Sequence, residues 1–439
     1  PNQARIIASA LGNPRRRDGY IECNNNSFVT WGLGHLMENQ SPEQYNEDWK
    51  VWGWDNLPIL PNEIKFTPKD NAKKQLKAIK SLIHDCTTFV IATDPDREGE
   101  LIAYLIMNEV GLKKSVTRKR LWNQDLNIEP MKKDLQRLKD AEETKPLYQA
   151  GLARSVADWL VGINMTRTAT LKFRSSKSNG GVLSIGRVQT PTLALIVDRE
   201  NEINNFKARD YYELKAKVLT DTGKNIIMSY APQDGNKIFD LKTAEELFLK
   251  VKNFQGPISV KQEEKRKGPP SLFDLTKLQR ECNKQFSWTA DYTLKITQSL
   301  YENHALLSYP RTDCSYLPEE HIDTIPDLME RLKTVPELDN IIKTIDKPLV
   351  RKTVYDDKKT SSHYAIIPTN KTPDLSKLSE DEKQMYLLVS RHYIAVHMAD
   401  YKYLITIITL DANGLCLKAS GSVPTSPGWK HAFLSDGKA

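Results

Sequence analysis

One segment constrains the fold of this chain more than any other. The apolar run Phe89–Ala92 predicts a buried strand, and Leu101–Val110 repeats apolar residues at helical spacing before Gly111, a residue well suited to end a helix. Between the two lies the acidic turn Asp94–Glu100. A strand, a turn and a helix in this order predict an open α/β sheet, whose sites lie beyond the carboxyl ends of the strands.

The acidic turn carries three carboxylates at alternate positions. Asp94, Asp96 and Glu98 would all point the same way if the backbone were extended through them. Like charges held this close repel unless a cation offsets them, and oxygen ligands of this kind suit Mg²⁺. The sequence therefore predicts a magnesium site, with a solvated acidic turn as the alternative.

A second motif, Leu307–Pro318, places Tyr309 beside Arg311 on a turn. A tyrosine hydroxyl has a pKa of about 10, so it becomes a nucleophile only where neighbouring charge stabilises the phenolate. Arginine presents a fork of donors to phosphate oxygens. The pair is therefore suited to attack on phosphorus, although a packed tyrosine and a solvated arginine would give the same short pattern.

Five segments together resemble one family. Asp94–Glu100 resembles the acidic signature of Toprim domains in type IA DNA topoisomerases, and Ser308–Asp313 resembles the active-site tyrosine motif of the topoisomerase III branch. Three more segments agree in order and approximate spacing: Thr30–Leu36, Leu183–Pro191 and His363–Thr369. Because five ordered matches rarely coincide by chance, the chain is identified as a member of that family.

The resemblance implies a multidomain α/β plus α fold in which the domains form a torus. The implied parts are a Toprim domain (1–140), a helical DNA-binding domain (141–206, completed by 421–439), a β-rich hinge domain (207–265 and 396–420) and a helical domain carrying the tyrosine (266–395).

The resemblance also implies the reaction. Tyr309 would attack one DNA strand and become linked to the 5′-phosphate, so that resealing needs no ATP. Arg311 would stabilise charge on the phosphoryl oxygens, while Asp94 and Asp96 hold Mg²⁺ with Glu98 as third ligand. The ion would chiefly organise the 3′ end for resealing. The expected partners are single-stranded DNA and negatively supercoiled or catenated duplex DNA, and the expected outcomes are relaxation and decatenation.

Further site residues follow from the same resemblance. His363 matches the histidine that contacts the scissile phosphate region, with a packed or capping histidine as the alternative. Ser184, Arg187 and Gln189 are implied phosphate and base contacts. Arg167 is a further DNA-contact candidate, although an arginine that ends a helical pattern also complements the helix dipole.

Composition agrees with this interpretation without requiring it. A chain of 439 residues predicts two to four domains. A net charge of +7 and a pI near 8.9 favour a polyanionic partner, but a protein of another function could carry that excess. No run of about eighteen apolar residues is present, so no membrane partner is expected. The five cysteines are scattered without zinc-site spacing, which predicts a cytoplasmic protein with free thiols, and we expect a monomer.

Local patterns predict the main elements. Strands at 21–23 and 27–31 flank an asparagine turn, and late strands at 403–410 and 415–419 are expected to pair with strands that follow Tyr211. Lys261–Pro270 reads as a charged linker. Helices are predicted over 71–86, 143–172, 192–201 and 290–303.

The chain departs from the family pattern at its start. The family carries a Glu-Lys pair directly before a proline, and this chain opens at Pro1–Arg5, which resembles the residues after that pair. We therefore expect a truncated or incompletely given chain, shortened also after Gly428–Lys430. Two rival functions share part of the pattern: a Toprim nuclease or primase, which needs no Tyr309, and a single-strand-binding or architectural module without catalysis.

Overall fold

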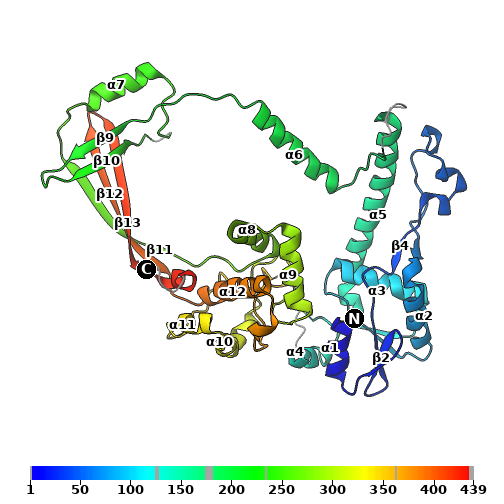
Figure 1. The fold of residues 1–439 in the computed structure, drawn as a ribbon. Helices are drawn as coiled ribbons and strands as arrows, with labels where there is room; N and C mark the ends of the chain where they lie inside the picture. Colours follow the sequence, from blue (N-terminus) through cyan, green and yellow to red (C-terminus); the bar gives the residue numbers. More distant parts are fainter. Residues whose placement is uncertain (1, 124–127, 174–180, 233–234, 361–362, 435–439) are drawn as a thin grey trace. The chain divides into compact units, whose positions relative to one another are not determined.

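The computed structural model describes residues 2–123, 128–173, 181–232, 235–360 and 363–434. They form two compact units, which are taken separately below. Unit 1 contains residues 1–198, 271–342 and 352–393, and unit 2 contains residues 199–270, 343–351 and 394–439. Figure 1 shows the order of the elements along the chain. Each unit is thus assembled from segments that are distant in sequence.

The first part of unit 1 begins with a helix packed on a hairpin. Strand β2 (Tyr20–Cys23) pairs antiparallel with β3 (Ser27–Thr30), and α1 (Asn2–Leu11) lies against them. Asn25 and Asn26 have positive φ in the turn, a backbone conformation that asparagine tolerates better than most residues. The predicted hairpin is confirmed.

The acidic turn belongs to a β–α–β unit. Strand β6 (Thr88–Ile91) runs parallel to β7 (Thr117–Arg120), and helix α3 (Arg97–Val110) connects them. A short strand, β8 (Lys139–Asp140), pairs antiparallel with β7. Gly111 adopts φ 73° and its N–H donates to the last turn of α3, as a glycine cap does. The strand and the capped helix predicted here are confirmed.

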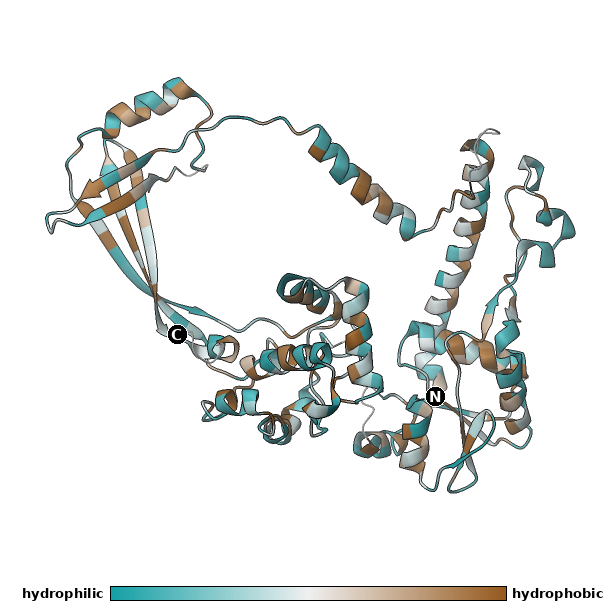
Figure 2. Ribbon diagram, in the orientation of Figure 1, coloured by the Kyte–Doolittle hydropathy of each residue, from teal (hydrophilic) through white to brown (hydrophobic). Residues whose placement is uncertain are grey.

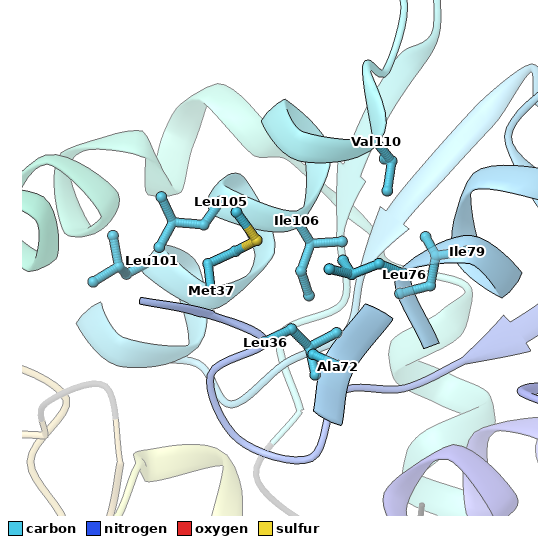
Figure 3. Packing of buried hydrophobic residues seen from close by; sticks show 9 residues of the cluster. All are labelled: Leu36, Met37, Ala72, Leu76, Ile79, Leu101, Leu105, Ile106 and Val110. Carbon is cyan, nitrogen blue, oxygen red and sulfur yellow. The ribbon is translucent and has the colours of Figure 1, made fainter. Parts of the chain in front are cut away.

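Helix α3 presents an apolar face to helix α2 (Lys73–Leu82). Figure 3 shows this cluster: Ile106 of α3 lies beside Leu76 of α2, and Leu101 and Leu105 lie toward Met37. Each fully buried aliphatic side chain contributes about 1.5–3 kcal/mol to folding. The helix predicted over 71–86 is shorter at both ends, because residues 70–72 form a 3₁₀ turn and the helix ends at Leu82.

The longest helix, α5 (Ala141–Phe173), crosses α3 at very short range. A Cβ atom added at Gly151 would lie 2.5 Å from the Arg97 carbonyl oxygen, so only glycine fits this crossing without a shift of the backbone. The helix predicted over 143–172 is confirmed. Through this crossing, α5 packs against the first turns of α3, the helix that begins in the acidic turn.

The tyrosine-bearing part of unit 1 is mostly helical, as expected. Asp274 and Thr289 cap the first two of its helices by accepting from backbone N–H groups of the first turn. The helix predicted over 290–303 is confirmed as α9. The helices of this part are α8 (Leu275–Phe286), α9 (Ala290–Glu302), α10 (Ile325–Leu332), α11 (Pro336–Ile342) and α12 (Glu380–Ala395).

Unit 2 contains a five-stranded antiparallel sheet in the order β11-β12-β13-β10-β9. Pairing of β13 with β10 confirms that the late strands join those after Tyr211. The prediction of a linker over 261–270 is wrong: residues 258–267 form β11, which pairs with β12 along its whole length. The strand bounds are β9 (Lys215–Leu219), β10 (Asn225–Tyr230), β11 (Ile258–Lys267), β12 (Tyr401–Ala412) and β13 (Leu415–Ser426).

One face of this sheet carries the core of unit 2. Met228, Leu410 and Leu417 are buried there, and Val251 at the end of helix α7 (Leu241–Val251) packs against them. Because side chains alternate along a strand, the residues between these core positions point to the opposite face.

Helix α6 (Gln189–Asn204) crosses the boundary between the two units, and it confirms the helix predicted over 192–201. Figure 2 shows hydrophobic and hydrophilic bands along it. Its aliphatic side chains are exposed, among them Leu193, Leu195 and Ile196.

The remaining elements are short. They are β1 (Arg15–Arg16), β4 (Met37–Asn39), β5 (Phe66–Pro68), α4 (Ile128–Leu135) and the 3₁₀ turns Pro42–Gln44, Glu47–Lys50, Trp54–Asn56, Asp70–Ala72, Glu319–Thr324, Leu375–Lys377 and Gly428–Phe433. Of the helices that the structure describes, none has both the length and the apolar character required to cross a membrane.

Candidate active site

The acidic turn changes from extended to helical backbone at Asp96. Asp96 is extended (φ −145°, ψ −179°), and its side chain caps α3 by accepting from the Gly99 N–H at 2.7 Å. Glu98 lies in the first helical turn, so the prediction that an extended stretch aligns all three carboxylates is wrong. The Glu98 side chain is 75% exposed, and its carboxylate lies 3.5 Å from Nε2 of His35.

Gly99 allows the turn to close on itself. A Cβ added there would lie 2.1 Å from the Asp94 carbonyl oxygen, far inside any allowed contact. The Thr93 hydroxyl also donates to the Gly99 carbonyl at 2.8 Å. The start of α3 is therefore packed directly against the strand end that carries Asp94.

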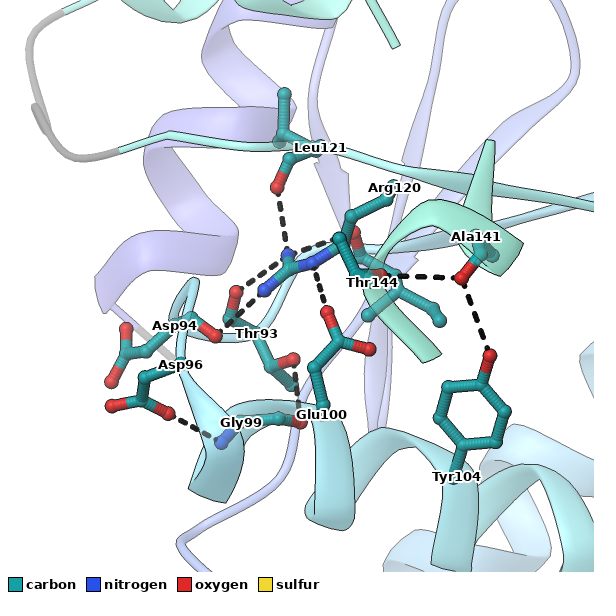
Figure 4. A network of polar contacts seen from close by, with 11 residues as sticks. Thr93, Asp94, Asp96, Gly99, Glu100, Tyr104, Arg120, Leu121, Ala141 and Thr144 are labelled. Carbon is teal, nitrogen blue, oxygen red and sulfur yellow. Dashed lines mark hydrogen bonds and ion pairs between the residues drawn. The ribbon is translucent and has the colours of Figure 1, made fainter. Parts of the chain in front are cut away.

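A buried arginine, which sequence analysis did not find, donates hydrogen bonds to the backbone of this turn (Figure 4). Arg120, at the end of β7, donates to the carbonyl oxygens of Thr93 (2.7 Å) and Asp94 (2.6 Å). It also donates to the Ile91 and Leu121 carbonyls and forms an ion pair with Glu100 at 2.6 Å in which both side chains are fully buried. Burial raises the pKa of Glu100 and lowers the pKa of Arg120, while the pairing opposes both shifts.

Two features of the sequence could have pointed to this arginine. The β–α–β pattern required a second parallel strand after α3, and Glu100 had no assigned role in the acidic motif. The strand itself, Thr117–Arg120, is basic and therefore lacks the apolar run that marks a buried strand.

Tyr309 lies next to the acidic turn. Its hydroxyl donates to Asp94 Oδ2 at 3.3 Å, joining two motifs that are 215 residues apart in the chain. Its ring stacks on His363 at 4.3 Å between centroids and meets Tyr301 edge-on at 5.4 Å. Nε2 of His363 lies 3.7 Å from Asp96 Oδ2. The structure thus brings together Tyr309, His363, Asp94 and Asp96.

The tyrosine segment and the histidine segment are held to each other. The Ser308 hydroxyl donates to the Ala365 carbonyl and accepts from the Ile367 N–H, both at 2.9 Å. Leu307 and Pro368 form an isolated β-bridge, and Ser308 is 2% exposed. These bonds fix the backbone on both sides of the Tyr309–His363 stack.

The charges at the site oppose ionisation of the phenol. Burial, followed by the negative charges of Asp94 and Asp96, raises the pKa of Tyr309 far above its ordinary value, and Arg311 acts in the opposite direction. Burial and the charge of Asp96 raise the pKa of Asp94. Burial would also raise the pKa of Asp96, but hydrogen bonds from His363 and the Gly99 N–H outweigh it, so the pKa of Asp96 is lowered. Arg311 itself is exposed.

Three of the predicted DNA-contact residues lie at the start of α6: Ser184 and Arg187 on the loop before it, and Gln189 as its first residue. Gln189 Nε2 donates to the Ser184 hydroxyl at 2.7 Å, and Arg187 pairs with Asp158 of α5 at 2.8 Å. Among the described residues, no hydrogen bond or ion pair links this loop to Asp94 or Tyr309. The structure therefore groups Ser184, Arg187 and Gln189 with α5.

Arg167 is placed differently from the other candidates. It is only 3% exposed, its guanidinium donates to the Trp49 carbonyl at 2.6 Å, and it lies over the Trp52 ring. Burial lowers its pKa and Glu43 opposes the shift. A packing role therefore accounts for Arg167 in this arrangement, and a DNA contact would require the Trp49–Trp52 segment to move.

Two carboxylates fit a magnesium ion. Figure 4 shows the carboxylates of Asp94 and Asp96 next to each other, on the side of the turn away from Arg120. Burial and then the charge of Asp96 raise the pKa of Asp94, and a bound cation would offset both effects. Mg²⁺ commonly takes one or two carboxylates and completes its shell with water and phosphate oxygens. Over the described residues, no three His, Cys, Asp or Glu side chains are grouped to hold an ion, so Glu98 as third ligand stays a prediction.

Comparison with known proteins agrees with this geometry. Residues 1–124 match the Toprim domain model, and residues 142–438 match the DNA topoisomerase model. A putative DNA topoisomerase 3 of Staphylococcus aureus RF122 is 38% identical over 434 residues, and DNA topoisomerase 3 of strain MRSA252 is 37% identical; each alignment covers 98% of this chain. The chain spans 59% of the length of these relatives.

A solved structure shares the fold. Full-length topoisomerase I from Thermotoga maritima superposes with a TM-score of 0.68 at 22% identity, covering 99% of this chain and 66% of that one. The predicted fold class, a Toprim α/β domain followed by helical and β-rich parts, is confirmed by these matches. With both family models matched in order and the acidic turn beside the motif tyrosine, the chain belongs to the type IA DNA topoisomerase family and resembles its topoisomerase III branch.

Proposed function

We propose that this chain carries out transient cleavage and resealing of one DNA strand through a covalent link between Tyr309 and a 5′-phosphate. The observation that carries the proposal is the 3.3 Å contact between the Tyr309 hydroxyl and Asp94, which joins the nucleophile to the acidic turn. A Toprim nuclease has no use for a tyrosine held in this position.

Cleavage is a single phosphoryl transfer in which one bond to phosphorus forms and one breaks. The Tyr309 oxygen forms a bond to phosphorus while the bond from phosphorus to the 3′ oxygen breaks. The phenolic proton leaves along the hydrogen bond to Asp94 and passes on to water, and the leaving 3′ oxygen takes up one proton from water, so no proton is gained or lost overall. Resealing reverses these changes, so the energy of the phosphodiester bond is kept in the phosphotyrosine and no ATP is needed.

The surroundings of Tyr309 explain why it needs assistance. The two nearby carboxylates and burial raise its pKa, so the phenolate forms only when positive charge offsets them. Arg311 supplies part of that charge, and we assign it to the phosphoryl oxygens. A magnesium ion held by Asp94 and Asp96 would supply further charge and bind phosphate oxygens. His363 would orient Tyr309 through the ring stack and reach the scissile phosphate region.

Several further assignments belong to the same proposal. Ser184, Arg187 and Gln189 would contact the strand, and the four domains would be those predicted from the sequence. We propose single-stranded DNA and negatively supercoiled or catenated duplex DNA as substrates, with relaxation and decatenation as outcomes, carried out by a monomer. All five cysteines are free, which suits the reducing cytoplasm.

The test is the covalent adduct on a labelled single-stranded oligonucleotide, trapped with denaturant during turnover in Mg²⁺. We expect a 3′-end label to migrate with the protein and a 5′-end label to leave as a free fragment. Tyr309→Phe should abolish the adduct, whereas Tyr301→Phe, which alters the tyrosine packed against it, should retain it.

Other outcomes separate the rivals. Cleavage that leaves no protein on the DNA would indicate a Toprim nuclease. DNA binding without any cleavage would indicate a binding module.

A further inference from the structure

We propose that unit 2 carries a second binding surface for single-stranded DNA, on the face of its sheet opposite the core. We call this the outer face, and its residues are Lys261, Glu263, Lys265 and Lys267 of β11, Tyr401, Tyr403, Ile405 and Ile407 of β12, Lys418, Ser420 and Ser422 of β13, and Lys430. The inference rests on the proposed function only in taking DNA as the ligand.

The strand register defines this face. Tyr401 pairs with Lys267 and Tyr403 pairs with Lys265, so the two tyrosines and the two lysines stand on the same face of neighbouring strands. The core position Leu410 has the opposite parity along β12, and its side faces α7. The tyrosines therefore lie on the sheet face that the core does not occupy.

The aromatic groups form a small platform. The rings of Tyr401 and Tyr403 are 5.3 Å apart and only 23° from parallel. Lys430 Nζ lies 3.5 Å from the Tyr401 ring centroid, and the Trp429 indole N–H donates to the Lys267 carbonyl, which anchors this segment to the edge of the sheet. Both tyrosines are partly exposed, so a planar base can reach them.

The charge of the outer face favours a polyanion. Five lysines stand on it against Glu263, with Asp411 near the hairpin turn at the far end. Glu263 is itself paired with Lys265 at 2.6 Å. Surfaces that bind single strands combine a basic track for the backbone with aromatic rings on which bases stack. The outer face has both, and stacking requires unpaired bases, so single-stranded DNA is the ligand that fits.

Matched charge reversals on the two faces of the sheet test the inference. The outer-face variant is Lys265→Glu with Lys267→Glu. Its matched control is Arg266→Glu with Lys402→Glu, a cross-strand pair of opposite parity with the same change in charge. Binding of the full chain to a fluorescent thymidine oligonucleotide of about 30 nucleotides is followed by anisotropy at several salt concentrations.

We expect the outer-face variant to lose affinity roughly tenfold or more and to lower the salt slope by about 1.4, since each phosphate contact on a single strand contributes about 0.7. The control should stay within about twofold. Tyr403→Leu, introduced alone with both lysines kept, should weaken binding by roughly tenfold. The salt slope should stay unchanged, because this substitution removes stacking and not charge. Equal losses for both charge reversals, or no loss for the outer one, would overturn the inference.

The adduct assay separates this inference from the proposed function. On a short oligonucleotide at saturating concentration, the outer-face variants should form the Tyr309 adduct as the parent does. A parent that forms no adduct would defeat the proposed function and leave the binding comparison intact.

Discussion

The acidic turn and the segment 184–189 are both short and polar, and each leads into a helix. They differ in how firmly the rest of the protein holds them. The acidic turn is held by the buried Arg120 and by the cap from Asp96. In the loop, Ser184 and Gln189 bond to each other near the surface, and Arg187 is 44% exposed and pairs with Asp158. Groups assigned to chemistry are fixed before the substrate arrives, while groups assigned to binding keep side chains that can change partners.

The largest effect should come from removing the support of the acidic turn. Arg120→Leu should destabilise unit 1 by about 3–5 kcal/mol, because it leaves the buried Glu100 carboxylate unpaired. Arg187→Leu should change stability by less than about 0.5 kcal/mol. Urea unfolding monitored by circular dichroism measures both.

A double variant separates the two roles of Arg120. Replacing Glu100 with Leu as well should restore only part of the loss, because the carbonyls of Thr93 and Asp94 would still lack their donor. Full recovery would show that the ion pair alone mattered and that the turn does not depend on this arginine.

A smaller effect should follow from a single methyl group. Gly99→Ala should cost about 1–3 kcal/mol, because the added Cβ would lie 2.1 Å from the Asp94 carbonyl oxygen and force α3 away from the turn. Gly181→Ala, at the edge of the loop region, has nothing within 4 Å and should be neutral or slightly stabilising. Thermal melts give the comparison, and equal shifts at the two positions would contradict it.

The two aspartates should respond oppositely to loss of charge. With metal removed by EDTA, Asp94→Asn should raise stability at neutral pH, because the pKa of Asp94 is raised in the fold and its ionisation is therefore unfavourable there. The pKa of Asp96 is lowered in the fold, so its negative charge stabilises the fold at any pH above the ordinary pKa of 3.8. Asp96→Asn should therefore lower stability at neutral pH.

Melting temperatures across pH 3 to 8 test these signs. Both differences from the parent should shrink as the pH falls, since the parent's aspartates then become protonated. A destabilised Asp94→Asn protein at neutral pH would show that the hydrogen bond from Tyr309 outweighs the repulsion from Asp96.

The smallest structural effect should come from the loop. Arg187→Ala should leave the melting temperature nearly unchanged and weaken binding of single-stranded DNA, with a salt slope lower by about 0.7, as expected for one lost phosphate contact. Fluorescence anisotropy measures the affinity, and Arg154→Ala is the control, since Arg154 also pairs with Asp158. Equal losses for the two arginines would contradict a specific contact at Arg187.

Much of the fold could be predicted because local patterns agree with their surroundings. The strand before the acidic turn, the helix capped by Gly111 and the asparagine hairpin all combine apolar spacing with a matching turn residue. The failed prediction of a linker over 261–270 has a clear cause. Residues 261–267 of β11 are mostly charged and nearly all exposed, so they show no apolar alternation, and their pairing with β12 supplies the order.

The candidate site was only partly visible for a similar reason. Glu98 was expected to align with the aspartates, but the cap at Asp96 starts α3 before it and turns its side chain toward His35. Arg120 was missed because four of its five partners are backbone carbonyl oxygens, and backbone acceptors leave no signature in a sequence.

The sequence by itself determined which residues could do the chemistry: a tyrosine beside an arginine, two aspartates after a strand, and a histidine in a third motif. The tertiary structure decided which of them meet. Tyr309 reaches Asp94 and stacks on His363 because Ser308 ties two backbone segments together and Arg120 fixes a third. Such bonds join backbone groups far apart in the chain, and their geometry exists only once the packing around them has formed.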